Sequence, residues 1–144
     1  MADISTLVQY DVAYPVHLEF NGERVGIRID IVSFDTKDVA KVANDIAGKR
    51  WAAVFENEDK KLKTEQVFEF AELEEQEKLI SAIKSWDFGG NSFGELGVDP
   101  ECTDANKRYL VCHQNSKWIR DQLKARAEDL GIFTQAPAKH SKKK

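Results

Sequence analysis

Two short runs of alternating apolar and polar residues lie near the N-terminus, and Asn21-Gly22 separates them. An Asn-Gly pair tolerates the positive φ angles of a two-residue turn, whose twist matches that of the strands it joins. The pattern therefore predicts an antiparallel β-hairpin. In the predicted register Leu18 lies opposite Val25, and Val16 lies opposite Ile27 on the same apolar face.

The segments on either side of this hairpin predict one more strand and a first helix. Residues 7–12 alternate more weakly and predict a third strand. Asp35 is placed to cap a helix that Gly48 would end, while residues 49–55 fit either a helical extension or a short strand. The apolar positions of the helix recur at i, i+3, i+4 and i+7, and they are Val39, Val42, Ala43 and Ile46.

A charged connection at residues 56–63 precedes a long helix that the pattern predicts over residues 64–86. Phe68 and Ala71 begin its apolar stripe, and the opposite face is acidic, as is typical of a face in contact with solvent. The stripe ends with Leu79, Ile80, Ile83 and Trp86. A loop that is rich in glycine then leads to Pro100.

The last third of the chain is again helical. Thr103 is placed to cap one helix, and Asn115-Ser116 interrupts the pattern and recaps a second. Gly131 is placed to stop this second helix, whose apolar positions are Ile119, Leu123 and Leu130. We therefore predict an α+β fold, with an N-terminal antiparallel β-hairpin packed against a helical C-terminal two thirds. Residues 1–133 form a single domain, and residues 134–144 form a basic tail.

Length and charge limit the classes of function. A chain of 144 residues is long enough to bury a core without disulfides, so Cys102 and Cys112 are expected as reduced thiols in the cytoplasm. No export signal and no membrane-spanning run is visible. The net charge is −4, and four of the lysines lie in the last six residues, so the rest of the chain is more acidic still. An acidic body argues against nucleic acid as the main partner.

The residues of common catalytic and cofactor sites are not found in the required patterns. The loop at residues 89–94 lacks the lysine of a phosphate-binding loop, and Cys102, Cys112 and His113 lack the close spacing of a metal site. Cys112 and His113 are neighbours on a helix and point about 100° apart, which does not suit a nucleophile and its base. The sequence therefore indicates neither an enzyme nor a cofactor nor a metal.

Binding of another protein is the class of function that remains. Trp86, Tyr109 and Trp118 are large amphipathic side chains of the kind that dominates binding interfaces, although all three also suit a core. Trp118 is the strongest of these candidates, because it lies off the apolar stripe of its helix.

The order of these elements resembles that of the tail assembly chaperones of long-tailed bacteriophages, over about residues 14–133. The resemblance rests on several short segments along the chain. These are Val25-Gly26-Ile27-Arg28-Ile29, Val32-Ser33-Phe34-Asp35-Thr36, Ile83-Lys84-Ser85-Trp86, Cys102-Thr103-Asp104-Ala105-Asn106, Trp118-Ile119-Arg120-Asp121-Gln122-Leu123 and Ile132-Phe133.

This resemblance implies a role without catalysis. Such chaperones bind the long, helical tape measure protein, keep it soluble, help to recruit subunits of the major tail tube protein, self-associate, and are absent from the virion. The chain would then act in the host cytoplasm as a homo-oligomer. Arg120 and Phe133 join the three aromatic residues as candidate partner-binding residues. The alternative is a structural virion protein, such as a tail tube or head-tail connector subunit.

Overall fold

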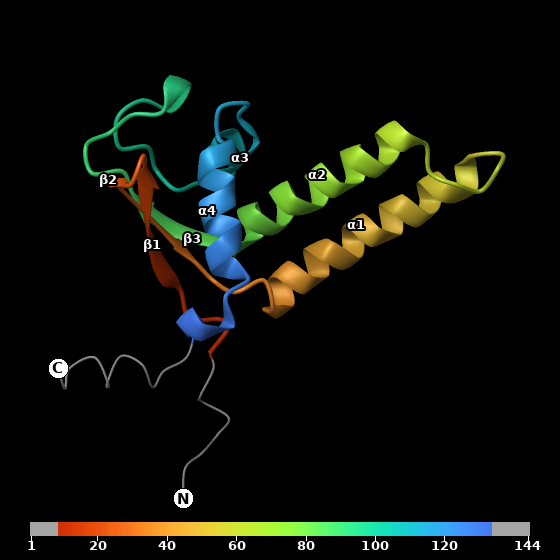
Figure 1. Cartoon of the computed structure of the whole chain (residues 1–144), viewed down its shortest axis with the longest axis horizontal. Coiled ribbons are helices and arrows are strands. Elements are labelled where there is room, and N and C mark those ends of the chain that lie inside the picture. Colours follow the sequence, from red (N-terminus) through yellow and green to blue (C-terminus); the bar gives the residue numbers. More distant parts are fainter. Residues whose placement is uncertain (1–8, 134–144) are drawn as a thin grey trace, which may run out of the picture.

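A three-stranded antiparallel sheet in the order β1-β2-β3 forms one end of the molecule, and helices pack against it (Figure 1). The structure is a computed structural model, and it describes residues 9–133. The predicted α+β fold is confirmed. The elements are β1 (Tyr14–Phe20), β2 (Glu23–Ile31), α1 (Lys37–Glu56), α2 (Thr64–Ala82), β3 (Ile83–Asp87), η2 (Gly94–Leu96), α3 (Asp104–Cys112), α4 (Lys117–Ala127) and η3 (Leu130–Phe133).

The predicted hairpin and its two-residue turn are present, and beside the turn the predicted register holds, since Glu19 lies opposite Arg24, but the predicted pair Val16–Ile27 is wrong. Val16 lies opposite Ile29, because a bulge shifts the register between the turn and the middle of the strands. The shift amounts to two residues of β2. Since side chains alternate between faces with a period of two, the apolar residues still face the core.

The bulge in β2 receives the glycine-rich loop that follows β3. Gly26 has a φ of 87° and Gly89 has a φ of 56°. A Cβ atom on Gly89 would lie 2.3 Å from the carbonyl oxygen of Gly26, so this close approach requires that residue 89 has no side chain. The Asn91 side-chain amide then donates hydrogen bonds to the carbonyls of Val25 and Phe88, at 3.0 and 2.8 Å.

The third strand of the sheet is β3, and the prediction of a strand at residues 7–12 is wrong where that segment is described, since it forms a turn there. Residues 7 and 8 lie outside the described residues. The predicted helix over residues 64–86 included most of this strand, because Ile83 and Trp86 are three residues apart, as on one face of a helix. In the structure these two residues lie opposite Ile31 and Ile29 of β2, across a bulge.

Helix α1 is longer than predicted and begins one residue later. Thr36, not Asp35, is its N-cap, and the Thr36 hydroxyl accepts a hydrogen bond from the backbone N–H of Val39 at 3.4 Å. The helix passes through Gly48 and continues to Glu56, so residues 49–55 are a helical extension. A glycine inside a helix costs about 1 kcal/mol relative to alanine, which is too little to end a helix of this length.

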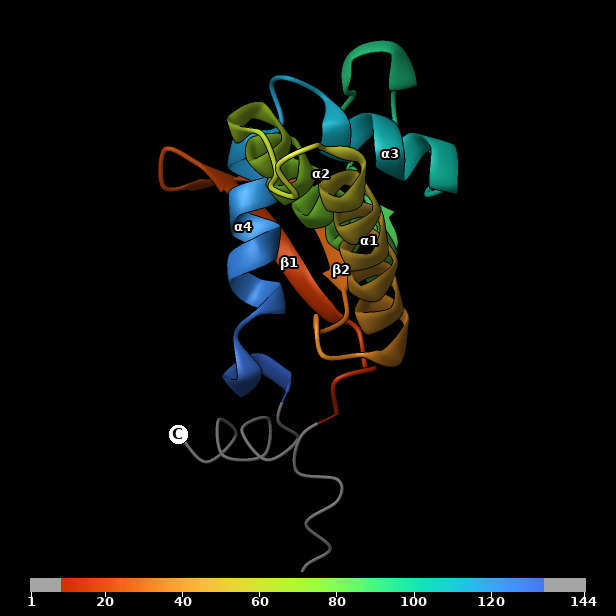
Figure 2. The ribbon, with the colours of Figure 1, turned by 90° about the vertical axis from the view of Figure 1, so that its right-hand side faces the viewer.

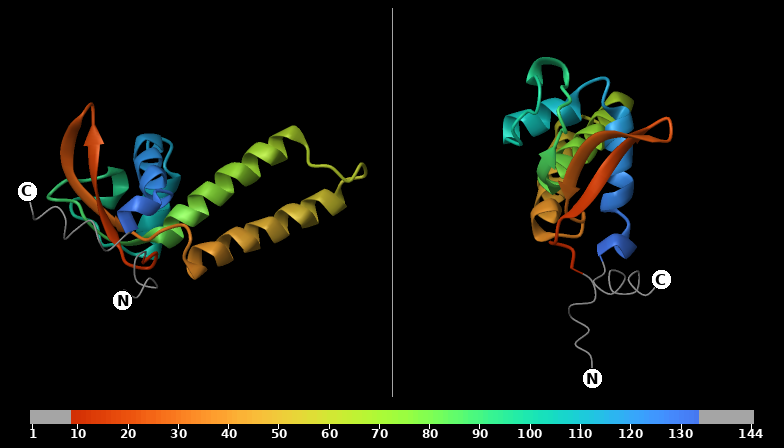
Figure 3. Two further views of the ribbon diagram at one scale, coloured as in Figure 1. Left: turned by 60° about the horizontal axis from the view of Figure 1, so that its bottom comes forward. Right: turned by 90° about the vertical axis from the view of Figure 1, so that its left-hand side faces the viewer.

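Helices α1 and α2 run side by side away from the sheet, as Figures 1 and 3 show. We call residues 47–73 the arm; they comprise the second half of α1, the connection, and the first half of α2. Phe68 and Ala71 were predicted to begin a buried stripe, but both are exposed on the arm. The remainder of the described chain is called the body.

The main core lies in the body, between the sheet, the end of α2, and helices α3 and α4. Val39 of α1 packs in a smaller cluster at the base of the arm. The buried residues of the main core are Val16, Leu18, Ile27, Ile29, Ile31, Leu79, Ile80, Ile83, Phe88, Leu110, Val111, Ile119, Leu123 and Ala127.

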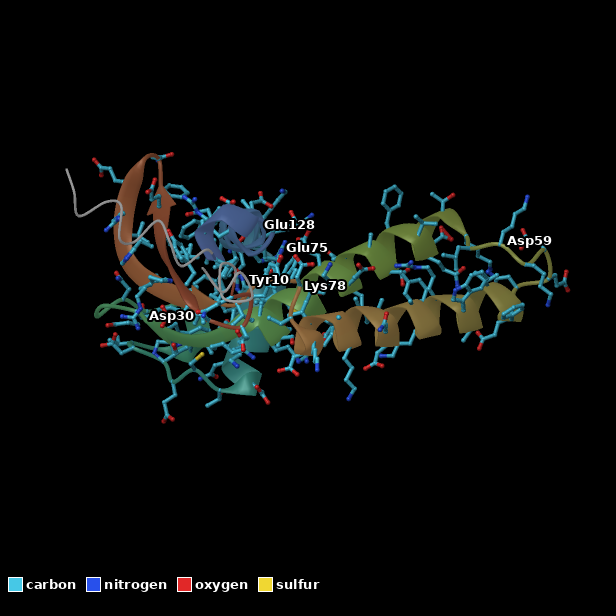
Figure 4. The ribbon with its side chains drawn as sticks, turned by 90° about the horizontal axis from the view of Figure 1, so that it is seen from below. Tyr10, Asp30, Asp59, Glu75, Lys78 and Glu128 are labelled. Carbon is cyan, nitrogen blue, oxygen red and sulfur yellow. The ribbon has the colours of Figure 1, made fainter. Side chains whose placement is uncertain are left out.

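The acidic face of α2 is not simply solvated, because three of its glutamates form ion pairs with other helices. Glu75 contacts Lys124 and Arg120 of α4 at 3.3 and 3.8 Å. Glu74 pairs with Arg50 of α1 at 3.0 Å, and Glu77 pairs with Arg108 of α3. Figure 4 shows Glu75 and Lys78 where the arm joins the body, whereas Asp59 lies at the far tip.

The C-terminal helices begin where the sequence predicts. Thr103 caps α3, and its hydroxyl accepts a hydrogen bond from the N–H of Asn106 at 3.2 Å. Ser116 is the N-cap of α4, but α4 ends at Ala127, before the predicted stop at Gly131. The predicted basic tail at residues 134–144 lies outside the described residues. Within residues 9–133, no helix has the length and apolar character to cross a membrane.

Candidate protein-binding surface

The arm carries the most exposed aromatic side chains of the described chain. Trp51 and Phe55 on α1 are each 63% exposed, Phe68 on α2 is 69% exposed, and Val67 beside it is 49% exposed. Transferring such side chains from water to an apolar contact is worth about 1.5–3 kcal/mol each. Exposed apolar side chains in this number are typical of a surface that binds another molecule.

Helical spacing explains how the two aromatic side chains of α1 come together. Trp51 and Phe55 are four residues apart on α1, so they lie one turn apart on the same face. Their rings are stacked, with centroids 6.0 Å apart and planes inclined by 28°. Val67 and Phe68 occupy the first half of α2, which is antiparallel to this part of α1 in Figure 1. Each helix thus contributes large apolar side chains to the arm.

The arm has no core of its own. The fully buried residues of α1 are Val39 and Ile46, and those of α2 are Leu79, Ile80 and Ala82. All of these lie at the base, outside residues 47–73. Two isolated helices that bury so little between them gain little stability from their contact. A third apolar element laid against the arm would supply the burial that its own two helices lack.

Polar contacts hold the connection at the tip of the arm. The Asn57 side-chain amide donates hydrogen bonds to the carbonyl of Lys61 at 2.6 Å and to the side-chain oxygen of Gln66 at 3.0 Å. The same oxygen of Gln66 accepts from the backbone N–H of Lys63 at 2.9 Å. These bonds satisfy backbone groups where the two helices meet, and they fix the return of the chain.

The five candidate residues from the sequence lie on the body, apart from the arm. The Trp86 ring is half-buried; its indole N–H donates to the carbonyl of Pro100 at 2.8 Å, and its ring packs edge-on against Phe88. Trp118 is also half-buried and contacts the ring of Phe20, with centroids 5.4 Å apart. Both tryptophans therefore have contacts within the chain.

Tyr109 likewise has partners in its own chain. Its hydroxyl accepts a hydrogen bond from the backbone N–H of Glu95 at 3.2 Å. Its ring lies beside Phe93 and His113, with centroids 6.2 and 5.4 Å away. This cluster connects α3 to the glycine-rich loop.

Arg120 and Phe133 serve the packing of the body. The Arg120 side chain is 12% exposed, and its guanidinium donates to the carbonyls of Val111 and His113 at the end of α3, at 2.7 and 3.2 Å. Phe133 is 4% exposed and packs edge-on against Tyr14. The structure therefore places neither side chain on an open surface.

The sequence reasoning missed Trp51 and Phe55 and assigned Phe68 to a buried stripe. A signal was present, since three large aromatic residues flank the short charged connection between two helices. Such a connection marks the tip of a helical hairpin, and a tip far from the sheet has nothing to pack against. The sequence did not indicate how far this hairpin projects.

Each of the two thiols has a pKa above its ordinary value. Burial raises the pKa of Cys102 above its ordinary value, and Lys107 only partly offsets this rise. Burial also raises the pKa of Cys112, against the opposing charge of Arg108. Since the thiolate is the reactive form, both changes reduce reactivity near neutral pH. Within residues 9–133, no group of three or more histidine, cysteine, aspartate or glutamate side chains is arranged to hold a metal ion.

Comparisons with known proteins add no relative to this description. No protein-family model matches the chain. Comparison with curated proteins finds no significant match. Comparison with solved structures finds none either.

Proposed function

We propose that this chain is a non-enzymatic assembly chaperone that binds an apolar, helical protein through the aromatic surface of its arm. The observation that carries the proposal is the exposure of Trp51, Phe55 and Phe68 on a helical pair that has no core of its own. A partner helix laid along the arm would complete a three-helix packing unit. Helices commonly dock in this way, through apolar residues one turn apart.

The charges around this surface suit reversible covering of an apolar partner. Glu65, Glu69 and Glu72 lie exposed on the arm part of α2. They add negative charge to the arm, which keeps a complex in solution and opposes the association of bare apolar surfaces. A chaperone that shields a client during assembly needs both properties.

The client in this proposal is the tape measure protein of a long-tailed bacteriophage. Support comes from the resemblance described above and from the arm, which presents its apolar side chains in the form that a long helical client requires. In this role the chain acts in the host cytoplasm, forms a homo-oligomer, helps to recruit major tail tube subunits, and leaves before the virion is complete. It needs no cofactor.

Co-expression with the product of the gene next downstream tests the proposal. We expect the long downstream protein to be soluble and to co-purify with this chain. The variant Trp51→Gln/Phe55→Gln should lose most of this effect. Val98→Gln is the matched control, because Val98 is 67% exposed but lies on the body.

If the downstream protein is equally soluble without this chain, the chaperone proposal is wrong. Detection of the chain in purified virions would then favour a structural subunit. If both the arm variant and the control keep the client soluble, binding to the client does not use the arm.

A further inference from the structure

The free edge of the sheet borders a second surface, which the proposed function does not use. Strand β1 pairs only with β2 in the described sheet, so no strand lies against its outer edge. A groove of about 450 Å³ runs along this edge, between β1 and the Gln122–Arg126 side of α4. Figure 2 shows α4 beside β1.

Part of this edge is already paired by a side chain. The Gln122 side-chain oxygen accepts a hydrogen bond from the backbone N–H of Glu19, and its NH₂ group donates to the carbonyl of Glu19, both at 2.8 Å. A side-chain amide here makes the two bonds that a neighbouring strand would make. These bonds also show that both backbone groups of Glu19 point outward from the sheet.

Alternation along the strand identifies the groups that remain open. Backbone groups of every second residue point to the same edge, so the N–H and C=O of His17 and the C=O of Pro15 point outward like those of Glu19. Pro15 has no N–H, and a proline is tolerated at an outer edge because no ladder bond is lost there. The open edge thus offers one donor and two acceptors to an incoming chain.

The charges lining the groove select the kind of chain. Arg24 of β2 and Arg126 of α4 both line it, and Glu19 is its acidic residue. Both arginines are exposed, and neither forms an ion pair with another residue in the described part of the chain. On a protein of net charge −4, two unpaired arginines beside an open strand edge form a local site for carboxylates.

We propose that this groove binds an extended, acidic segment of a partner polypeptide, which adds to β1 as a fourth strand. Hydrogen bonds to His17 and Pro15 hold its backbone, and Arg24 and Arg126 bind its carboxylates. Helix α4 lines one side of the groove. The inference does not depend on the arm or on the proposed client.

A fluorescein-labelled heptapeptide of alternating threonine and glutamate tests the charge selection. We expect it to bind at least about tenfold more tightly than the same peptide with lysine in place of glutamate, by fluorescence anisotropy. Arg24→Glu/Arg126→Glu should weaken binding about tenfold or more. Lys41→Glu/Lys49→Glu makes the same charge change on α1 and should leave the affinity unchanged.

His17 provides the test of strand addition. His17→Pro removes the outward N–H without removing a bond between β1 and β2, so the fold should be kept while binding falls about tenfold. His17→Ala keeps the N–H and should bind as the parent protein does. The peptide should also slow hydrogen exchange of the His17 amide.

Several outcomes would overturn the inference. One is the absence of saturable binding of the glutamate peptide up to about 1 mM. Equal affinity for the lysine peptide would exclude the charge selection. Equal binding by His17→Pro and His17→Ala, each with the parent's circular dichroism spectrum, would exclude strand addition.

Discussion

The ring of Phe20, at the tip of the hairpin, meets the ring of Trp118 on α4 edge-on, at 5.4 Å between centroids. Trp118 lies off the apolar stripe of its helix, and this contact gives its ring a partner within the chain. It joins the N-terminal hairpin to the C-terminal part of the chain, and Trp118 also packs against the main core.

Replacing Trp118 should therefore weaken the fold. We expect Trp118→Ala to lower the free energy of unfolding by about 2–4 kcal/mol, since a large, half-buried ring is lost. Phe20→Ala should cost less, because Phe20 is 52% exposed. In a double-mutant cycle measured by urea denaturation, the pair should show a coupling of about 0.5–1.5 kcal/mol. A stable Trp118→Ala protein with impaired client binding would instead make Trp118 an interface residue.

The ion pairs at the base of the arm should matter more than those on the open surface. Glu75→Gln leaves Arg120, whose side chain is 12% exposed, without its carboxylate, and should lower the free energy of unfolding by about 1–2 kcal/mol. Asp121→Asn removes an exposed ion pair with Lys117 and should change the free energy of unfolding by less than about 0.5 kcal/mol. The free energies of unfolding of both variants can be measured by chemical denaturation. Equal losses of stability would contradict this account.

Gly89 should be intolerant of any side chain. In Gly89→Ala the new Cβ would meet the carbonyl oxygen of Gly26 at 2.3 Å, in a backbone conformation with positive φ. We expect a loss of about 2–4 kcal/mol in thermal or urea unfolding. Gly90→Ala is the control, because Gly90 also has a positive φ but no atom within 4 Å of the added Cβ, so the loss should be about 1–2 kcal/mol. Similar losses in both variants would leave no role for the contact with Gly26.

The thiols should react slowly at neutral pH. Since burial raises the pKa of Cys102 and of Cys112, each thiolate forms at a higher pH than that of a free cysteine. Alkylation by iodoacetamide should therefore be slower than that of free cysteine at pH 7, and its half-maximal rate should move to higher pH. Measurement on Cys102→Ser and Cys112→Ser separates the two sites. A half-maximal rate at or below the pH of free cysteine would contradict the assignment.

The sequence predicted those parts of the fold whose backbone conformation is determined by the residues at the position itself. One example is the turn at Asn21-Gly22, where both residues tolerate positive φ angles. Others are the helix caps at Thr103 and Ser116, which are residue types common at helix N-termini. The sequence failed at β3, because the spacing of Ile83 and Trp86 satisfies either a helix or a strand across a bulge. Tertiary pairing with β2, which no local pattern contains, decides between the two.

The candidate binding surface was harder to predict for the same reason. A stripe of apolar residues indicates one face of a helix, but not whether the fold supplies a partner for that face. Phe68 satisfies the periodicity of a buried residue, yet it lies beyond the reach of the body. Conversely, Phe133 and Arg120 were candidates for binding, but the body encloses both.

The separation of arm and body also divides the chain into residues that determine its structure and residues free to vary. Because residues 47–73 contribute nothing to the buried core, substitutions on their outer faces should leave the unfolding free energy of the body nearly unchanged. A changed partner sequence can then be matched by changes on the arm alone. A fold built in this way can acquire new binding specificity through surface substitutions, without passing through unstable intermediates.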